Sequence, residues 1–305
     1  MASKVYPLPK LYHPDFALPN VKPKGPVEID WDNPITRDLR ACFIPDAHGT
    51  MREVISGDGP ISDTGSVRAT QHGLIRAYDP TTPDQSEYTV QDAYNILSPS
   101  GHSIFVIVDY DALTNYGGLC SCSTTVTSHG WTLDTGSAPT RKDIAFLRSN
   151  GSGYNQWAGD ISGNDISAGD TFKRICVTSS DNLIGTQPKI YIDGVETTSY
   201  DNILNTDTGA ITVSTSNMFI GARKDDASKL DGGIHMVCIF DRELSEAEVK
   251  ELTGTPFQIL RPAIPLTYFV PGAAAAGGRT AISLAHYGGL AAYGGLAGKH
   301  GGLAG

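Results

Sequence analysis

The sequence has few cysteines and no long apolar run. Its 305 residues include five cysteines, at positions 42, 120, 122, 176 and 238. An odd number of cysteines in a long chain argues against a disulfide framework, so we expect most of the thiols to be reduced. No stretch approaches the roughly 20 apolar residues of a membrane-spanning helix, and the start MASKVYPLPK lacks the apolar core of a signal peptide. The sequence therefore predicts a protein that is made in a cytoplasm and does not insert into a membrane.

Basic side chains and recognisable catalytic motifs are also scarce. The chain has 23 Lys and Arg against 33 Asp and Glu, a formal net charge of -10. Such a surface repels phosphate backbones, which argues against nucleic-acid binding. The sequence contains no G-x-S-x-G elbow, P-loop, dinucleotide fingerprint or H-E-x-x-H motif. The eight histidines are scattered, and we interpret His129 and His235 as packed or surface residues.

The N-terminal segment, residues 1–37, is predicted to be an extended arm. Seven of the 18 prolines lie within the first 34 residues, and proline favours extended backbone both at its own position and at the residue before it. The arm also carries apolar side chains that suit contact with another surface: Tyr6, Leu11, Tyr12, Phe16 and Leu18. We therefore expect the arm to lie across a neighbouring subunit or partner, and the protein to be a homo-oligomer, with a trimer as the preferred state.

The central part of the chain has the pattern of an all-β fold. Short apolar runs separated by turn residues predict strands at 104–108, 172–178, 190–193, 218–221 and 234–240. Asp193-Gly194 predicts a two-residue hairpin turn. One short helix is expected over 246–253, because Ser245 and Glu248 have the spacing of a capping box and Gly254 follows.

The C-terminal segment, residues 271–305, differs sharply in composition. It contains 11 glycines and 10 alanines, no acidic residue, and a near-repeat that reads YGGLAA, YGGLAG, KHGGLAG. A single chain of this composition buries too little to offset its backbone entropy, which predicts a flexible tail. Glycine also allows close backbone packing, so ordering between copies in an oligomer is the alternative.

A family resemblance adds to this reading. LDGGIHMVCIFDRELSEAEVKELTGTPFQIL, residues 230–260, resembles the closing strand and helix of concanavalin A-like jelly rolls of the laminin-G-like group. The IFVIV strand, the KIYIDGVE hairpin and MFIGAR occur in the order typical of that family. The resemblance implies a laminin-G-like jelly-roll sandwich over residues 38–270, with one short C-terminal helix.

The flanks of this domain indicate a context. GPVEIDWDNPITRDLRACFIP and TGTPFQILRP look like the flanks of laminin-G-like proteins of tailed bacteriophages. This resemblance implies a non-enzymatic virion protein with other virion proteins as partners, first of all a tail-fibre or adhesin component that contacts host surface glycan. A capsid decoration protein is the alternative in the same class, and a polysaccharide-degrading glycoside hydrolase is the alternative of another class.

Glycan binding needs aromatic side chains for stacking beside groups that form directional hydrogen bonds. Tyr154, Asn155 and Trp157 lie close together in SNGSGYNQWAGDISGND and have this composition. They are the candidate ligand-binding residues. The alternative is that Tyr154 and Trp157 belong to the core or to a hairpin.

Acidic residues were weighed for metal binding and for catalysis. No resident cofactor is expected. Asp225, Asp226 and Asp231 are weak candidates for the calcium site that laminin-G-like domains often have, because His235 and Met236 replace acidic residues there.

The segment EIDWD, residues 28–32, places Glu28, Asp30 and Asp32 at alternate positions, as in jelly-roll glucanases. Its place between Pro26 and Pro34 in the arm, and the shorter aspartate at position 32, argue against catalysis.

Overall fold

The computed structural model describes residues 23, 26–46, 50–63, 66–70, 73–77, 86–88, 94, 99–113, 117–123, 129–135, 144–160, 166–197, 199–202, 209–212, 215–223 and 230–263. All of these residues except Ala263 belong to one compact unit, Met1–Pro262. Within the described part of the chain, no helix has the length and apolar character needed to cross a membrane.

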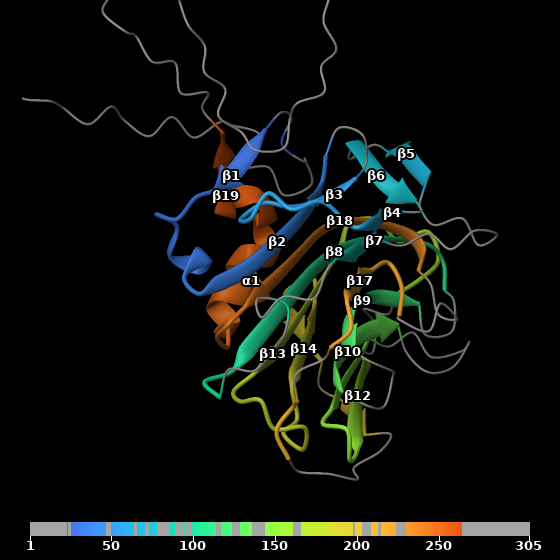
Figure 1. Ribbon diagram of the computed structural model, residues 1–305, viewed down its shortest axis with the longest axis vertical. Coiled ribbons are helices and arrows are strands. Elements are labelled where there is room, and N and C mark those ends of the chain that lie inside the picture. The colour runs from blue at the N-terminus through green and yellow to red at the C-terminus, as the bar shows by residue number, and fades with distance from the viewer. Residues whose placement is uncertain are drawn as a thin grey trace, which may run out of the picture. The chain divides into compact units, whose positions relative to one another are not determined.

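Two antiparallel sheets form a sandwich (Figure 1). The nine-stranded sheet contains β2 (Leu39–Pro45), β3 (Met51–Glu53), β5 (Ser66–Thr70), β6 (Gly73–Ala77), β8 (His102–Ala112), β13 (Lys173–Ser179), β14 (Lys189–Ile192), β15 (Val195–Glu196) and β18 (Asp231–Phe240). The eight-stranded sheet contains β4 (Ser62–Asp63), β7 (Ser86–Tyr88), β9 (Gly118–Ser123), β10 (Gly130–Thr135), β11 (Ile144–Ser149), β12 (Tyr154–Asp160), β16 (Ser199–Asn202) and β17 (Met218–Ile220). This architecture confirms the predicted jelly roll.

The apolar run 104–108 forms the centre of β8, between β13 and β18. Its side chains alternate between two hydrophobic clusters, because successive residues of a strand point to opposite faces. Ile104, Val106 and Val108 belong to the cluster between the two sheets. Phe105 and Ile107 belong to a second cluster on the outer face of the nine-stranded sheet. A strand buried on both faces explains why the run is continuously apolar.

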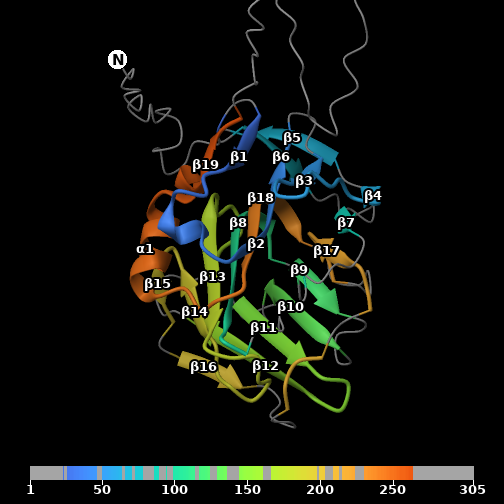
Figure 2. The ribbon, with the colours of Figure 1, turned by 60° about the vertical axis from the view of Figure 1, so that its left-hand side comes forward.

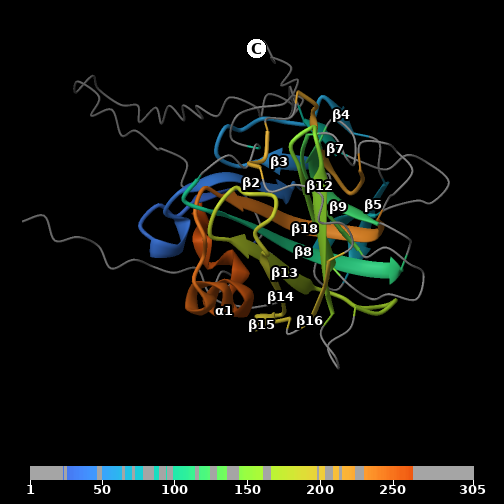
Figure 3. The same cartoon turned by 90° about the horizontal axis from the view of Figure 1, so that it is seen from below.

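The second cluster is covered by the C-terminal elements. These are the helix α1 (Glu246–Gly254), the 3-10 turn η4 (Pro256–Ile259) and the short strand β19 (Leu260–Pro262). Val249, Leu252 and Phe257 are fully buried in the cluster. Figure 3 shows α1 on the side of β13 and β14 that faces away from β9 and β12. The nine-stranded sheet is therefore the middle layer of three.

The residues just before β2 belong to this outer layer. β1 (Val27–Ile29) pairs with β19 in a separate two-stranded sheet, and the 3-10 turn η2 (Pro34–Thr36) follows it. The sequence places residues 27–37 in the arm, but Val27–Ile29 pair with a strand more than 200 residues away and the turn after them packs on the outer layer. Figure 2 places β1 and β19 at the top of the molecule and β12 and β16 at the bottom.

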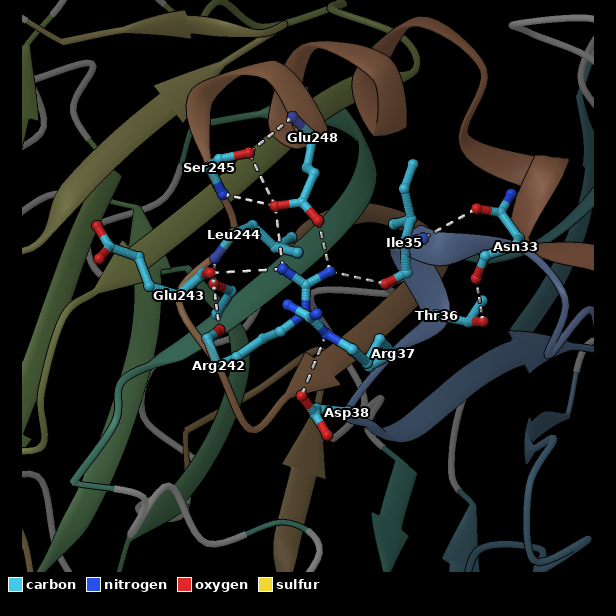
Figure 4. A network of polar contacts seen from close by, with 11 residues as sticks. Asn33, Ile35, Thr36, Arg37, Asp38, Arg242, Glu243, Leu244, Ser245 and Glu248 are labelled. Atoms are coloured by element: carbon cyan, nitrogen blue, oxygen red, sulfur yellow. Dashed lines mark hydrogen bonds and ion pairs between the residues drawn. The ribbon is translucent and has the colours of Figure 1, made fainter.

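One arginine joins these outer elements (Figure 4). Arg242 Nη2 donates to Glu248 Oε1 at 2.7 Å and to the backbone oxygen of Ile35 at 3.2 Å. Arg242 Nε donates to the backbone oxygen of Arg37 at 2.9 Å. The D-R-x-L-S step that carried the family resemblance therefore connects the start of α1 to the turn after β1.

The predicted local elements agree closely with the structure. The helix expected over 246–253 is observed as Glu246–Gly254, and both hydrogen bonds of the Ser245–Glu248 capping box are present. The predicted hairpin joins β14 to β15 through Asp193 and Gly194, whose φ angles are 51° and 81°. Two consecutive positive φ angles match the turn that Asp-Gly favours. The five cysteines are free and buried, as expected of reduced thiols.

Candidate functional site

Three loop segments meet at one end of the sandwich, which we call the loop end. They are residues 149–154 at the turn between β11 and β12, residues 180–188 between β13 and β14, and residues 209–212 before β17. Backbone hydrogen bonds join them: Ile184 N to Gly209 O at 2.8 Å, Ile211 N to Asn182 O at 2.8 Å, and Thr212 N to Ser149 O at 3.4 Å. The three segments therefore form one connected surface.

The turn between β11 and β12 is held in a fixed shape. Asn150 Oδ1 accepts hydrogen bonds from the backbone nitrogens of Ser152 and Gly153, each at 3.0 Å. Gly151 has a φ of 86°, and a Cβ there would lie 2.4 Å from the ring of His129. The position therefore requires glycine, and the imidazole of His129 packs directly against the turn.

The structure separates the three predicted ligand-binding residues. Register with β11 pairs Trp157 with Phe146 and Asn155 with Arg148, so both face the interior between the sheets. Asn155 is fully buried and Trp157 is 8% exposed. Only Tyr154 is half-buried, at the edge of the loop end. The expectation that Trp157 and Asn155 lie exposed beside Tyr154 is therefore corrected: Trp157 belongs to the core, which was the alternative, because it and Asn155 face inward, and Tyr154 lies on the other face of β12.

Asn155 supports the loop end from inside. Its Nδ2 donates to the backbone oxygen of Ile184 at 2.8 Å. Ile184 is itself fully buried, whereas its neighbour Leu183 is 42% exposed. The amide of Asn155 thus fixes the position of segment 180–188, which presents Leu183 to solvent.

A buried arginine supports the same segment. Arg148 is fully buried, and its guanidinium donates to Ser179 Oγ at 2.9 Å and to the backbone oxygen of Thr186. Burial lowers the pKa of Arg148 to about 10, and the nearby Asp181 carboxylate opposes part of that shift. Segment 180–188 is therefore anchored by two inward side chains, from β11 and β12.

A histidine lies close to this arginine. His102 begins β8 opposite Ser179 and is almost completely buried, with its ring 5.9 Å from that of Phe146. Burial lowers the pKa of His102 well below its usual value, and the positive charge of Arg148 lowers it further. His102 is therefore neutral at physiological pH.

The exposed part of the loop end has the chemistry of a polar ligand site. Its exposed or half-buried side chains offer hydroxyls, amides, a carboxylate, an imidazole and one phenol ring: His129, Asn150, Ser152, Tyr154, Asp181, Asn182, Gln187 and Thr212. Amides and hydroxyls both donate and accept hydrogen bonds, and a phenol ring adds a flat apolar face. This combination suits ligands rich in hydroxyl groups.

The weak calcium candidates are only partly described. Asp225 and Asp226 lie outside the described residues, and Asp231 begins β18 opposite Ala112 of β8. Among the residues whose positions the structure gives, no group of three His, Cys, Asp or Glu side chains is arranged to hold a metal ion. A calcium site in the 225–231 loop stays a prediction.

His235, which replaces an acidic residue of related domains, is buried in a polar pair. Its Nε2 lies 3.1 Å from Asp109 Oδ1, and the same oxygen accepts a hydrogen bond from the backbone nitrogen of Phe172 at 2.6 Å. The ring of His235 also packs against that of Phe172, with centroids 4.7 Å apart. The interpretation of His235 as a packed residue agrees with this position.

The alternating carboxylates of EIDWD have structural partners. Glu28 Oε1 accepts a hydrogen bond from Arg261 Nε at 2.6 Å, across the β1–β19 pair. Asp30 Oδ1 accepts from the backbone nitrogen of Asp32 at 3.2 Å and so closes the turn after β1. Glu28 and Asp30 therefore lie on the outer layer, where they stabilise a strand pair and a turn.

Two groups of residues remain: the predicted assembly residues, and buried side chains that sequence reasoning did not single out. The assembly residues Tyr6, Leu11, Tyr12, Phe16 and Leu18 lie outside the described residues. Sequence reasoning missed Arg148, His102 and Arg242 as organising side chains. The apolar run 144–147 before Arg148 indicates a strand that includes it, but its partners Ser179 and Thr186 come from another part of the chain.

Comparison with known proteins identifies the fold. The family model described as "Concanavalin A-like lectin/glucanases superfamily" matches residues 83–250. The binding domain of Paraclostridial Mosquitocidal Protein 1 is similar, with 14% identity and a TM-score of 0.53. The match covers 72% of this chain and 52% of that one, so it spans about half of that binding domain.

A second solved structure is matched over almost its whole length. It is domain 4 of AbnA, a GH43 extracellular arabinanase from Geobacillus stearothermophilus, in complex with arabinotriose. The identity is 14% and the TM-score 0.51, with 71% of this chain and 98% of that chain covered. At this identity the likeness concerns the fold. The comparison with curated proteins gives no match.

Proposed function

We propose, from the premise that the chain belongs to the concanavalin A-like lectin/glucanases superfamily, that it is a non-catalytic glycan-binding protein of a tailed-bacteriophage particle. Its sandwich contacts host surface glycan as part of a tail fibre or adhesin. The glycan binds at the loop end, where Tyr154 stacks on a sugar ring and the surrounding amides and hydroxyls form hydrogen bonds with its hydroxyl groups.

The position of the loop end is the observation that carries this proposal. The described chain enters the sandwich at β1 and leaves it at β19, and these two strands pair directly. β12, which begins at Tyr154, lies at the other end of the molecule (Figure 2). A domain attached to a particle through its two flanks in this way presents the loop end outward.

Two further observations support the proposal. The arabinanase domain of the same architecture was solved with arabinotriose, so this type of sandwich accommodates an oligosaccharide in that protein. The flanks that resemble those of bacteriophage proteins contain β1 and β19, so the two segments that carry the resemblance are neighbours in space.

A binding measurement with matched variants tests the proposal. The full-length protein is titrated with surface polysaccharides of bacteria, and we expect saturable binding. Tyr154→Ala is expected to weaken binding at least 10-fold, about the value of one stacking contact. Tyr154→Phe keeps the ring and is expected to bind nearly as well. Val195→Ala is the control, because Val195 is 53% exposed on the separate β14–β15 hairpin.

The two alternatives predict different results. A capsid decoration protein gives labelled copies spread over the capsid in an image of the particle, where our proposal places them on the tail. A polysaccharide-degrading enzyme releases new reducing ends from the polysaccharide, and Glu28→Gln abolishes their release. Turnover of that kind overturns the proposal, and so does binding that Tyr154→Ala and Val195→Ala weaken equally.

A further inference from the structure

We infer that the turn formed by residues 30–37 is a docking site for the proline-rich arm of a second copy of this chain. We call these residues the Trp31 turn. The inference concerns the end of the molecule at β1 and does not depend on glycan binding at the loop end. It rests on an exposed aromatic ring, a rigid backbone, the local charge and the extended pairing of β1 with β19.

Trp31 is unusually accessible. It is 55% exposed, whereas the other two tryptophans, Trp131 and Trp157, are 0% and 8% exposed. Pro34, in the same turn, is also exposed. Flat aromatic surfaces beside a proline are the groups that bind proline-rich segments, whose rings stack on the indole face.

The turn that carries Trp31 is rigid. Its hydrogen bonds are Asn33 N to Asp30 O at 3.0 Å, Thr36 N to Asn33 O at 3.1 Å, Thr36 Oγ1 to Asp30 O at 3.0 Å and Ile35 N to Asn33 Oδ1 at 3.0 Å. Asn33 Nδ2 also donates to the backbone oxygen of Gln258 at 3.2 Å, and Arg242 binds the backbone oxygens of Ile35 and Arg37 (Figure 4). A rigid surface loses little entropy when it binds a partner.

The charges of the turn and of the arm are complementary. Glu28, Asp30 and Asp32 lie within five residues, and Arg261 lies beside them, with its guanidinium 2.6 Å from Glu28 and 4.0 Å from Asp30. Arg37, at the end of the turn, pairs with Asp38 at 3.7 Å, so the carboxylates remain in excess. Residues 1–25 contain four lysines, at positions 4, 10, 22 and 24, against one acidic residue, Asp15. An acidic site and a basic segment attract each other and favour correct pairing.

The direction of β1 favours the arm of another copy over the arm of the same chain. β1 is extended and paired with β19, and its first residue, Val27, is the end of the strand that lies farther along the chain from Trp31. The four residue steps between Val27 and Trp31 span at most about 13 Å. The prolines at 19, 23 and 26 favour extended backbone in the sequence, which opposes the reversal that a return to Trp31 requires.

Isotope-mixed cross-linking tests where the arm docks and whether the docked arm comes from a second copy of the chain. Unlabelled and 15N-labelled full-length proteins are mixed while dilute, concentrated together and treated with a carbodiimide, which joins lysine to carboxylate side chains. We expect mass spectrometry to find Lys22 or Lys24 joined to Asp32 or Glu28 in pairs that combine both isotopes. Pairs of a single isotope only show binding within one chain and overturn the inference, and so does a monomer at every concentration in sedimentation.

Fluorescence and variants provide an independent readout. Because Trp131 and Trp157 are buried, quenching by acrylamide reports mainly on Trp31. We expect quenching to fall as the protein is concentrated and associates. Trp31→Ala is expected to raise the dissociation constant for self-association about 30-fold, as for an aromatic hot spot, and Trp31→Phe much less. Ile61→Ala is the control, since Ile61 is 60% exposed elsewhere.

An exchange of charges between the two surfaces distinguishes specific docking from non-specific association. Asp32→Lys is expected to weaken self-association, and combining it with Lys22→Glu and Lys24→Glu is expected to restore it. If quenching is independent of concentration, if Trp31→Ala and Ile61→Ala behave alike, or if the charge exchange gives no recovery, the inference is wrong.

Discussion

Two buried arginines hold chain segments against the sandwich in different electrostatic settings. Arg242, on the outer layer, meets the carboxylate of Glu248 at 2.7 Å and two backbone oxygens. Arg148, between the sheets, donates to a hydroxyl and a backbone oxygen. Within the described structure, no carboxylate lies at hydrogen-bond distance from Arg148. The first arginine has a neutralising partner in contact, and the second has only polar neutral ones.

The pKa values follow this difference. The hydrogen bond from Arg242 lowers the pKa of Glu248 to about 2, so that pair is ionised over a wide range of pH. Burial lowers the pKa of Arg148 to about 10, a sign that the interior disfavours its charge. Perturbed groups that cost stability gather at functional sites more often than elsewhere. The Arg242 cluster therefore joins elements of the outer layer, whereas the Arg148 cluster holds segment 180–188 of the loop end, where we propose that glycan binds.

The largest effect is expected from Arg242→Met. The change leaves Glu248 without its cation and releases the Trp31 turn from α1, so the free energy of unfolding should fall by about 3 kcal/mol. Chemical denaturation measures the change. Arg261→Met is the matched control, because the Arg261–Glu28 pair is exposed and should contribute less than about 1 kcal/mol. Equal losses in the two variants would show that Arg242 has no special structural role.

Acid should destabilise the protein in two separate windows. The folded pKa of His102 lies below its unfolded value near 6.5, so the unfolded state binds the extra proton first and stability falls as pH decreases below about 6.5. The slope from this one group is at most about 1.4 kcal/mol per pH unit. The folded pKa of Glu248 is also lowered, so its contribution is lost as pH falls below about 4.5 toward 2.

Unfolding experiments at several pH values separate the two groups. His102→Leu should flatten the upper window and leave the lower one, whereas Glu248→Gln should do the reverse. The quantity to compare is the slope of the unfolding free energy against pH. The absolute free energies are not compared, because either substitution also changes packing. A wild-type upper slope in His102→Leu would mean that another group is responsible.

Local patterns predicted much of the fold. The continuous run at 104–108, the Asp-Gly turn at 193–194 and the S-x-x-E spacing at the start of α1 each reflect interactions within a few residues, and each was confirmed. The pairing of β1 with β19 joins residues more than 230 positions apart, such as Val27 and Pro262. No local pattern contains that information, which is why residues 27–37 were assigned to the arm.

The composition of 149–165 predicts a glycan site, which stays a prediction, and leaves open whether Tyr154 and Trp157 belong to the core or to a hairpin. The structure places both residues on β12 of a hairpin, where a shift of one residue along the strand exchanges its two faces. Trp157 and Asn155 share the inner face with Phe146 and Arg148, and only the register of β11 with β12 reveals this. The sequence therefore could not decide which of the three residues contacts a ligand.

Asn155 and Gln156 lie on opposite faces of β12, and we expect their substitution by alanine to have different effects on glycan affinity. Asn155→Ala removes the hydrogen bond to Ile184 and should cost about 1 to 2 kcal/mol of stability. It should also weaken glycan binding, because segment 180–188 loses an anchor. Gln156→Ala is the control: its side chain is nearly as buried but lies on the other face. Equal loss of glycan affinity in both variants would argue against a role for Asn155 in positioning that segment.

The smallest change in global stability is expected from Arg148→Met. The variant removes a desolvated cation, and this gain offsets part of the cost of leaving Ser179 Oγ and the Thr186 oxygen without their donor, so the net loss should be about 1 kcal/mol. Segment 180–188 nevertheless loses the hydrogen bond that the backbone oxygen of Thr186 accepts from Arg148. Its amide hydrogens should therefore exchange faster. A loss of stability as large as that of Arg242→Met would remove the contrast between the two arginines.

Hydrogen–deuterium exchange with and without a bound oligosaccharide tests whether the loop end is the glycan-binding surface. The full-length protein is saturated with an oligosaccharide from a surface polysaccharide that it binds, and protection is measured along the whole chain. We expect added protection to concentrate in residues 149–154, 180–188 and 209–212. Protection confined to any other part of the chain, with these three segments unchanged, would contradict this expectation.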